Sequence, residues 1–139
     1  TTAAVLIIGL FALSSCGNPG PRPVKINEDV CAFCKMTVTD PLFASQLTTL
    51  KGRQYMFDDL RCMTAYKKEN TVLEVDRFYV ADFCSPPAFI DLEHAFLLSS
   101  DSLRSPMGGN VAAFAIQDSA KHYKDRYGAS EVSWADLMR

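Results

Sequence analysis

The amino-terminal end limits how much of this 139-residue chain can fold. Residues 3–13 (AAVLIIGLFAL) form an unbroken apolar run of eleven residues. A helix needs about 20 apolar residues to span a bilayer, whereas the apolar core of a secretion signal has about 7–15. We therefore assign residues 1–15 to a signal peptide that is truncated at its start, because no basic residue precedes the run. Roughly 110 residues remain for the fold, the usual size of one domain.

The residues after the apolar run resemble a lipidation signal. Leu13-Ser14-Ser15-Cys16 is similar to the bacterial lipobox, in which the cysteine becomes lipid-modified and amino-terminal. The Gly- and Pro-rich stretch that follows predicts an extended tether. We expect residues 16–28 to be the lipidated Cys16 and a flexible tether, and residues 29–139 the folded domain. The sequence thus predicts a membrane anchor made of lipid on the periplasmic side of the envelope, with Gly17 favouring the outer membrane.

The charge pattern and the lack of a catalytic motif favour a binding protein. The chain has 14 Lys plus Arg against 16 Asp plus Glu, and no basic stretch interleaved with aromatics that would follow a nucleic-acid backbone. No nucleophile stands beside an evident base, and there is no phosphate-binding loop. Asp58-Asp59 is more simply a helix-capping pair than an acid/base couple. We therefore expect neither nucleic-acid binding nor enzymatic activity.

The pattern from Asp29 onward is that of an α+β domain. Short β-branched and aromatic runs alternate with two helix-like segments, expected over residues 59–69 and 118–127. Asp58 or Asp59 and Gln117 or Asp118 stand where N-caps would, and Gly128 where a helix would stop. A short third helix is expected over residues 93–99. Strands are predicted over residues 37–39, 44–50, 54–57, 77–83, 88–91, 112–116 and 132–134.

A weak internal repeat suggests two similar halves. Residues 57–67 (FDDLRCMTAYK) align with residues 114–124 (FAIQDSAKHYK), matching at Phe, Tyr and Lys with identical separations. The match falls on a predicted strand followed by a predicted helix. It is compatible with duplication of one strand–helix unit, although three identities can also arise by chance.

Three sulfur groups within six residues form the sharpest chemical feature. Cys31-Ala32-Phe33-Cys34-Lys35-Met36 offers two thiols and a thioether. Soft sulfur ligands select Cu(I) over hard ions and most divalent competitors. A thiol binds metal as thiolate, so uptake releases protons and depends on pH. Phe33 is placed to shield such an ion from water.

Other interpretations of the Cys-x-x-Cys pair have to be weighed. A c-type haem site needs His where Lys35 stands, so haem attachment is excluded. A thiol-disulfide oxidoreductase using Cys31 and Cys34 remains the main alternative, although the residues after Cys34 predict a strand and a turn where that class has a helix. Disulfides that merely close loops are a third possibility. A structural zinc site is a fourth, and it would need ligands from among Cys62, Cys84, His94 and His122.

A methionine in a turn is the second candidate ligand. Met107 lies between Pro106 and Gly108-Gly109, where a thioether can project to a site instead of filling core. Cys62-Met63 falls on the first predicted helix, where core filling is the simpler interpretation. His94 and His122 have polar neighbours and are expected on the surface.

Taken together, these motifs resemble the NosL family of nitrous oxide reductase accessory proteins. The resemblance runs from Cys31 to about Gly128 in matching order and spacing. It is carried by the lipobox, the Cys-x-x-Cys-x-Met stretch, Phe57-Asp58-Asp59 with Cys62-Met63, Ile90-Asp91 with Ala95, and Ser105-Pro106-Met107-Gly108-Gly109 with Ala113-Phe114.

Membership of this family implies a periplasmic Cu(I) lipoprotein with two ββαβ halves. It also implies a copper chaperone for the metal centres of nitrous oxide reductase, working with an ABC-type assembly complex. The resemblance places Cys34 and Met107 next to the metal, with Cys31 and Met36 as helpers. One departure bears on Met36, because Lys35 stands where the family usually has Gly.

Overall fold

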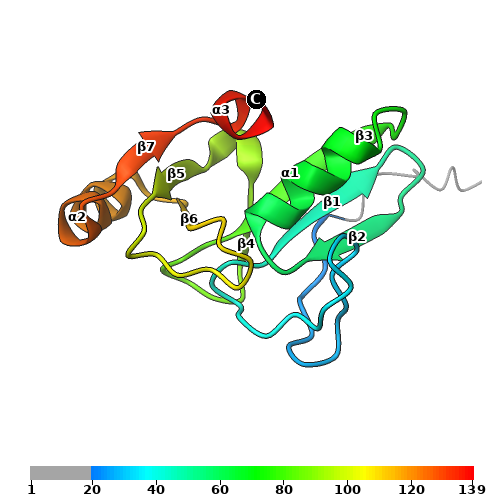
Figure 1. Cartoon of the computed structure of the whole chain (residues 1–139), viewed down its shortest axis with the longest axis horizontal. Helices are drawn as coiled ribbons and strands as arrows, with labels where there is room; N and C mark the ends of the chain where they lie inside the picture. Colours follow the sequence, from blue (N-terminus) through cyan, green and yellow to red (C-terminus); the bar gives the residue numbers. More distant parts are fainter. Residues whose placement is uncertain (1–19) are drawn as a thin grey trace, which may run out of the picture.

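The structure, a computed structural model, describes residues 20–139 and contains two antiparallel sheets (Figure 1). The first has the order β2-β1-β3-β4 and is built from β1 (Ser45–Thr49), β2 (Gln54–Phe57), β3 (Val75–Ala81) and β4 (Phe89–Asp91). The second has the order β6-β5-β7 and is built from β5 (Phe96–Ser99), β6 (Val111–Phe114) and β7 (Ser130–Val132). The helical elements are α1 (Leu60–Glu69), the 3-10 turn η1 (Leu92–His94), α2 (Gln117–Tyr127) and α3 (Trp134–Met138). The predicted signal peptide and Cys16 lie outside the described residues.

The predicted α+β class with two ββαβ halves is confirmed. One half runs β1-β2-α1-β3 and the other β5-β6-α2-β7, and in each the first strand lies between the other two. The residues of the weak repeat occupy equivalent positions. The ring of Phe57 lies 5.2 Å from that of Tyr66, and the ring of Phe114 lies 5.3 Å from that of Tyr123. In both halves, therefore, the same aromatic pair packs the helix on the end of the preceding strand.

The main hydrophobic cluster is shared by the two halves. An isolated parallel bridge joins Asp82 to Ala113, and the backbone N–H of Phe83 donates to the Ala113 carbonyl at 2.9 Å. Helix α3 adds a second link, because the Trp134 ring packs 4.9 Å from Phe78 on β3 and Lys68 Nζ donates to the Leu137 carbonyl. The main cluster contains buried side chains from both halves, among them Leu47, Phe57, Met63, Val80, Leu97 and Val111.

Three predicted elements are wrong. The segment expected as a helix over residues 93–99 is the turn η1 followed by β5, because β5 is central and pairs with both β6 and β7. The strand expected over residues 37–39 is a single bridge between Val30 and Thr37. The last strand is β7, ending at Val132, because Ser133 and Asp136 form a capping box that starts α3.

Two of the three predicted helix caps are confirmed. Asp59 caps α1, and its carboxylate accepts from the Cys62 N–H. Gly128 ends α2 in the left-handed conformation (φ 56°), which a glycine adopts without steric cost. The predicted cap of α2 is wrong, since Ile116 occupies that position and makes no side-chain cap bond.

Residues 20–28, assigned above to the tether, have contacts with the domain. Gln46 Nε2 donates to the Arg22 carbonyl, and Arg22 forms a two-pronged ion pair with Asp29. Val24 and Ile26 pack against buried Val38. The chain is therefore held on the sheet from its first described residues. None of the helices within residues 20–139 combines the length and hydrophobicity required to cross a bilayer.

Candidate metal centre

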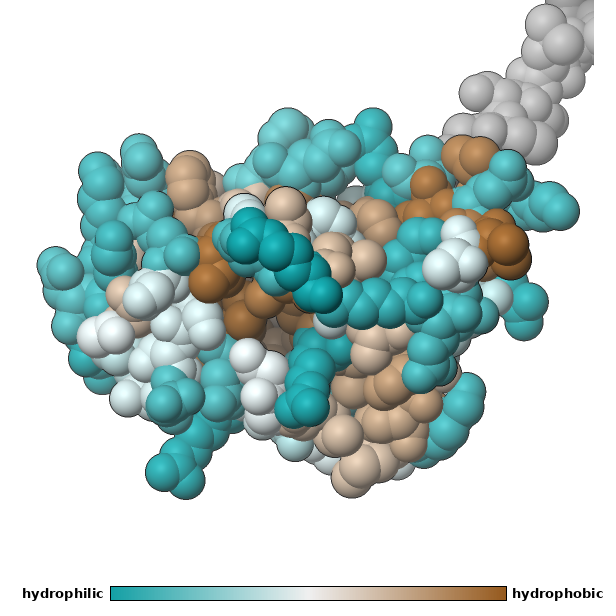
Figure 2. Space-filling view, turned by 45° about the horizontal axis from the view of Figure 1, so that its top comes forward, coloured by the Kyte–Doolittle hydropathy of each residue, from teal (hydrophilic) through white to brown (hydrophobic). Residues whose placement is uncertain are grey.

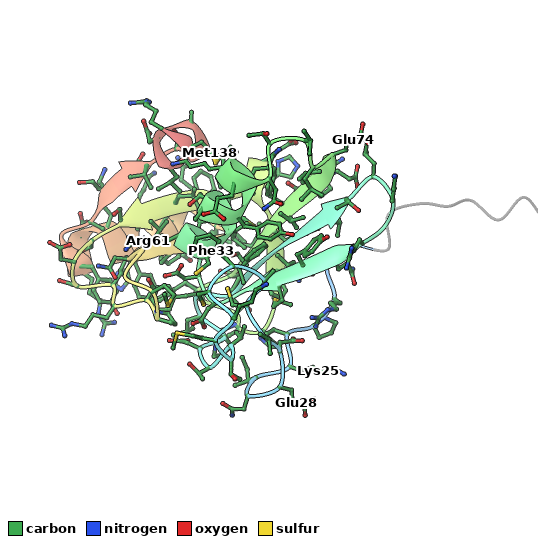
Figure 3. All side chains as sticks on the ribbon, turned by 45° about the vertical axis from the view of Figure 1, so that its right-hand side comes forward. Lys25, Glu28, Phe33, Arg61, Glu74 and Met138 are labelled. Atoms are coloured by element: carbon green, nitrogen blue, oxygen red, sulfur yellow. The ribbon has the colours of Figure 1, made fainter. Side chains whose placement is uncertain are left out.

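Three cysteine sulfurs meet beside the first turn of α1. The Sγ atoms of Cys31, Cys34 and Cys62 lie within 4.8 Å of one another. Three thiolates around one ion, with metal–sulfur bonds of about 2.3 Å, stand about 4 Å apart. The cluster is thus close to the spacing that one metal ion requires. Figure 3 shows sulfur atoms near the labelled Phe33, at the start of α1.

Backbone hydrogen bonds hold the loop that carries the first two cysteines. The Cys31 N–H donates to the Met36 carbonyl at 2.8 Å, and the Lys35 N–H donates to the Cys31 carbonyl at 3.1 Å. The Ala32 N–H donates to Met56 on β2 at 2.8 Å. The loop is closed on itself and fixed to the sheet, so the two thiols are positioned before any metal arrives.

The three thiols are electrostatically unequal. The Cys62 thiol donates to the Cys31 sulfur, and backbone N–H groups of Asp58, Cys34 and Phe33 add to this, so the pKa of Cys31 falls to about 5 despite its burial. The pKa of Cys62 is raised in turn by that same hydrogen bond and by burial. The pKa of Cys34 is raised chiefly by burial. Cys31 is therefore the first of the three thiols to ionise as the pH rises.

The carboxylate of Asp59 joins α1 to the methionine turn. Oδ1 accepts from the Cys62 N–H at 3.1 Å. Oδ2 accepts from the Ser105 hydroxyl at 2.7 Å and from the N–H groups of Met107 and Gly109 at 3.1 and 3.2 Å. One buried side chain thus fixes the position of Met107 relative to Cys62, although 45 residues separate them in sequence.

The two glycines after Met107 are required by this close approach. Gly108 has φ +69°, a left-handed conformation that side chains disfavour. A Cβ on Gly109 would lie 2.8 Å from Arg61 Cβ and 3.2 Å from Asp59 Oδ2. A side chain at position 109 would therefore push the methionine turn away from α1.

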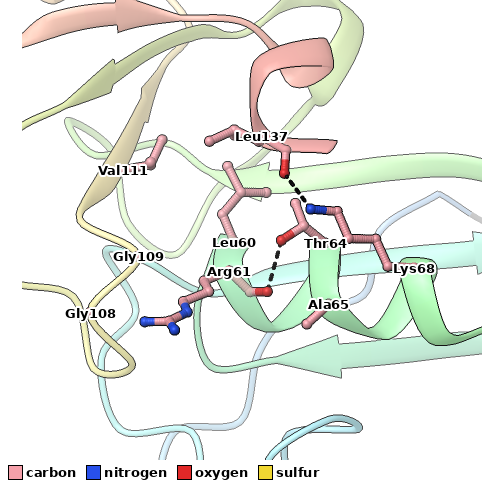
Figure 4. Close-up of a pocket in the computed structure, with 9 residues that line it drawn as sticks. All are labelled: Leu60, Arg61, Thr64, Ala65, Lys68, Gly108, Gly109, Val111 and Leu137. Carbon is pink, nitrogen blue, oxygen red and sulfur yellow. Dashed lines mark hydrogen bonds between the residues drawn. The ribbon is translucent and has the colours of Figure 1, made fainter. Parts of the chain in front are cut away.

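A hollow of about 360 Å³ borders the turn on α1 (Figure 4). Gly108 and Gly109 form one wall, and Leu137 of α3 closes the far end. Arg61 Nη1 donates to the Met107 carbonyl at 3.3 Å, which adds a second tie between helix and turn. These hydrogen bonds hold the methionine turn through its backbone atoms. They do not involve the Met107 thioether.

The predicted ligands occupy different depths. Cys31 is buried, Cys34 is partly exposed, and Met107 is half-buried against the core cluster that contains both cysteines. Met36 is 56% exposed, at the outer edge of the loop. Phe33 is half-buried against the same cluster, beside the cysteines.

Cys62 was missed as a site residue by the sequence analysis, which interpreted it as core. It is only 2% exposed, yet its sulfur belongs to the cluster. Within residues 20–139, the other zinc candidates, Cys84, His94 and His122, do not belong to this cluster. The four cysteines of this range are all free thiols. The available signal was the cap Asp59 three residues before Cys62, which marks a helix amino terminus.

A sequence comparison with family models assigns the chain to one family. A family-level sequence model described as NosL matches residues 23–139. The chain belongs to the NosL family. Among solved structures, the crystal structure of the copper chaperone NosL from Shewanella denitrificans matches with a TM-score of 0.72 and 22% identity, over 85% of this chain and 96% of that one. At this identity the match establishes the fold. The search of curated proteins found no match.

Within this NosL-family site, Lys35 has a backbone conformation that glycine adopts more easily. Its φ is +65°, in the left-handed region. Its ammonium group donates to the Ala32 carbonyl at 2.6 Å and is thereby turned back on the loop. The loop is therefore closed with Lys35 in place, although a residue with a Cβ is strained at this positive φ.

Replacing Asp59 should loosen both the helix start and the methionine turn. We expect Asp59→Asn to lower the free energy of unfolding by about 3 kcal/mol, because an amide cannot accept all four hydrogen bonds and buried donors are left unpaired. Urea unfolding of the reduced protein measures this. Asp58→Asn is the matched control: Asp58 is equally buried, one of its oxygens has no partner in the described structure, and burial raises its pKa. Equal losses for both variants would contradict the role given to Asp59.

Copper affinity should strengthen as pH rises. Cys34 and Cys62, with raised pKa values, are protonated near neutrality and must each release a proton to bind, whereas Cys31, with a pKa of about 5, does not. Between pH 6 and 8 we expect log K for Cu(I) to increase by about two per pH unit. In Cys34→Ser the slope should fall to about one. Competition titrations at several pH values measure it, and a flat dependence would exclude ligation by Cys34 and Cys62.

Relieving the backbone at position 35 should stabilise the protein. We expect Lys35→Gly to raise the free energy of unfolding by about 1 kcal/mol, because glycine adopts positive φ without a Cβ clash. Lys35→Ala removes the same charge but keeps the Cβ, and it should give no such gain. Denaturant unfolding of the two variants side by side separates the backbone effect from the charge, and equal gains would assign the effect to the ammonium group.

Proposed function

We propose that this protein is a Cu(I) chaperone. The observation that carries the proposal is the convergence of three thiol sulfurs within 4.8 Å, next to a methionine turn held by Asp59. Thiolate and thioether ligands favour Cu(I) over harder ions. The family and the fold shared with the copper chaperone from Shewanella denitrificans support the assignment. Cys34 and Met107 remain our first choices as ligands, and Cys62 joins Cys31 as a further candidate beside Met36.

The graded exposure of the sulfur groups suits release to a partner. Cys31 and Cys62 are buried, Cys34 is partly exposed and Met36 is largely exposed. An acceptor ligand can approach from the Cys34 side and join the ion before the buried thiolates let go. Copper then passes by ligand exchange through a shared intermediate, and no free ion is released.

The protein is proposed to act on the periplasmic side of the envelope, anchored by lipid at Cys16. The apolar run, the lipobox and the position of this cysteine just before the folded domain support this location. An anchor raises the effective concentration of the donor near an acceptor held in the same envelope.

The proposed client is nitrous oxide reductase, reached through an ABC-type assembly complex. This step rests on the family resemblance of the sequence motifs. A role in carrying copper needs no catalytic group, which agrees with a non-enzymatic protein.

The rival hypothesis, a thiol-disulfide oxidoreductase using Cys31 and Cys34, is disfavoured by how the two thiols are placed. An attacking thiolate must be both ionised and accessible. Here Cys31, with the lowered pKa, has no exposed surface, whereas the more exposed Cys34 has a raised pKa. The arrangement protects a thiolate for a metal ion and does not present it to a disulfide.

Anaerobic titration of the reduced protein from Asn18 onward with Cu(I), against a competing chelator, tests the proposal. We expect one copper per chain by mass spectrometry, and at least tenfold weaker binding for Cys34→Ser, Cys62→Ser and Met107→Leu. Cys84→Ser and Met138→Leu are the matched controls, since Cys84 stands outside the sulfur cluster and Met138 ends α3. Both should bind like the parent protein.

The opposite results are equally informative. If a sample with verified free thiols binds no copper, the chaperone proposal fails, and reduction of a disulfide substrate by the same sample would favour the oxidoreductase. If Met107→Leu binds like the parent while Cys34→Ser does not, the site is a thiol site without the methionine.

A further inference from the structure

Two exposed aliphatic side chains lie on adjacent loops at the end of the domain that lies opposite the sulfur cluster. Leu50, in the turn between β1 and β2, is 64% exposed, and Val72, in the loop between α1 and β3, is 92% exposed. The Leu50 N–H donates to the Glu74 carbonyl at 3.1 Å, so the two loops are side by side. Val72 lines a hollow of about 310 Å³ together with Lys51 and Arg53, which belong to the same turn as Leu50. Figure 2 shows hydrophobic surface among charged groups at this right-hand end.

The loop that carries Val72 is fixed in place. Lys67 Nζ donates to the carbonyls of Asn70, Thr71 and Leu73, and the Leu73 N–H donates to Asn70. Val72 therefore cannot fold back on the core without breaking these bonds. Val72 is thus an apolar side chain that the loop holds in contact with water and that is available to bind an apolar surface.

The described chain begins at this same end. Gln54, the first residue of β2, donates from Nε2 to the Gly20 carbonyl at 2.7 Å, and Arg53 of the turn directly precedes it. Only residues 17–19 stand between Gly20 and Cys16. Four residues span at most about 14 Å when fully extended. That is no more than the radius of gyration of a domain of this size, about 14 Å.

We propose that the loop end formed by Leu50, Lys51, Arg53 and Val72 rests on the lipid bilayer. The proposal depends on lipidation of Cys16, which is part of the proposed function. A lipid at Cys16 keeps Gly20 within about 14 Å of the membrane, which brings the two loops to its surface. Leu50 and Val72 enter the boundary between headgroups and acyl chains, and Lys51 and Arg53 face the headgroups. Glu74 at the same end limits the electrostatic attraction, so the aliphatic pair carries the contact.

This orientation sets where the copper site faces. Cys62 lies in the first turn of α1, whereas Lys67 and Asn70, which form the base of the Val72 loop, lie at its other end. A ten-residue helix is about 15 Å long. Figures 1 and 3 show the two ends apart, with Arg61 and Phe33 near the start of α1 and Glu74 at the far end. The sulfur cluster therefore points away from the bilayer, toward an acceptor in the aqueous compartment.

Lipid quenching of single tryptophans tests the orientation. The full lipoprotein, purified from membranes, is reconstituted into vesicles of phosphatidylcholine and phosphatidylglycerol with or without brominated acyl chains. Trp134→Phe removes the one native tryptophan. Tryptophan is then introduced by Leu50→Trp or Val72→Trp. The matched control is Ile116→Trp, because Ile116 is an aliphatic residue of the other half that is 63% exposed.

We expect brominated lipid to quench the emission of Leu50→Trp and Val72→Trp at least twofold and to leave Ile116→Trp unchanged. Equal quenching at all three positions, or none at 50 and 72 in protein with verified lipid on Cys16, overturns the orientation and leaves the lipoprotein assignment standing. A third result is that tryptophans at positions 50 and 72 are protected from aqueous iodide but are not quenched by brominated lipid. If dilution of the protein then restores quenching by iodide, a second copy of the chain covers this end and the proposal fails. If mass spectrometry finds no lipid on Cys16, the anchor fails and the orientation fails with it.

Discussion

The buried carboxylate of Asp59 is the interaction on which the site depends. It caps α1 at the Cys62 N–H and accepts three further hydrogen bonds from the Ser105–Gly109 turn. These donors come from the two halves of the fold, so this carboxylate fixes their relative position where the sulfur ligands meet. A carboxylate buried to 1% exposure is stable only when its hydrogen bonds are made, which makes the arrangement all-or-none.

The two ββαβ halves differ at the start of their helices, and the three clustered cysteines belong to the first half and the loop before it. The aromatic pairs Phe57–Tyr66 and Phe114–Tyr123 have nearly the same spacing. At the helix start, however, the positions equivalent to Asp59 and Cys62 are Ile116 and Ser119. The second half keeps the packing and lacks the capping carboxylate and the thiol. The second half contributes the Met107 turn to the site. This turn precedes β6 and is hydrogen-bonded to Asp59 and Arg61 of the first half.

Residues that are neighbours in sequence predicted the elements whose ends depend on local hydrogen bonds and backbone conformation. Helices α1 and α2 were predicted within one residue, because the Asp59 side chain caps the start of α1 and Gly128 ends α2 in the left-handed backbone conformation. The short apolar run Phe96–Ser99 was misassigned, because a run of that length fits a buried helix as well as a central strand. Its pairing with both β6 and β7 decides the matter, and those partners lie 12 or more residues away in sequence.

The sequence by itself determined the sulfur-rich loop at Cys31–Met36 and the methionine turn at Met107. These features depend on neighbouring residues, on turn chemistry and on side-chain type. Only the tertiary structure decided that Cys62 joins Cys31 and Cys34, that Cys84 does not, and that Cys31, the thiol with the lowered pKa, is buried. The physical reason is that β1 and β2 lie between Cys34 and Cys62 in the chain. The pairing of those strands returns α1 to the loop, and no local pattern encodes that return.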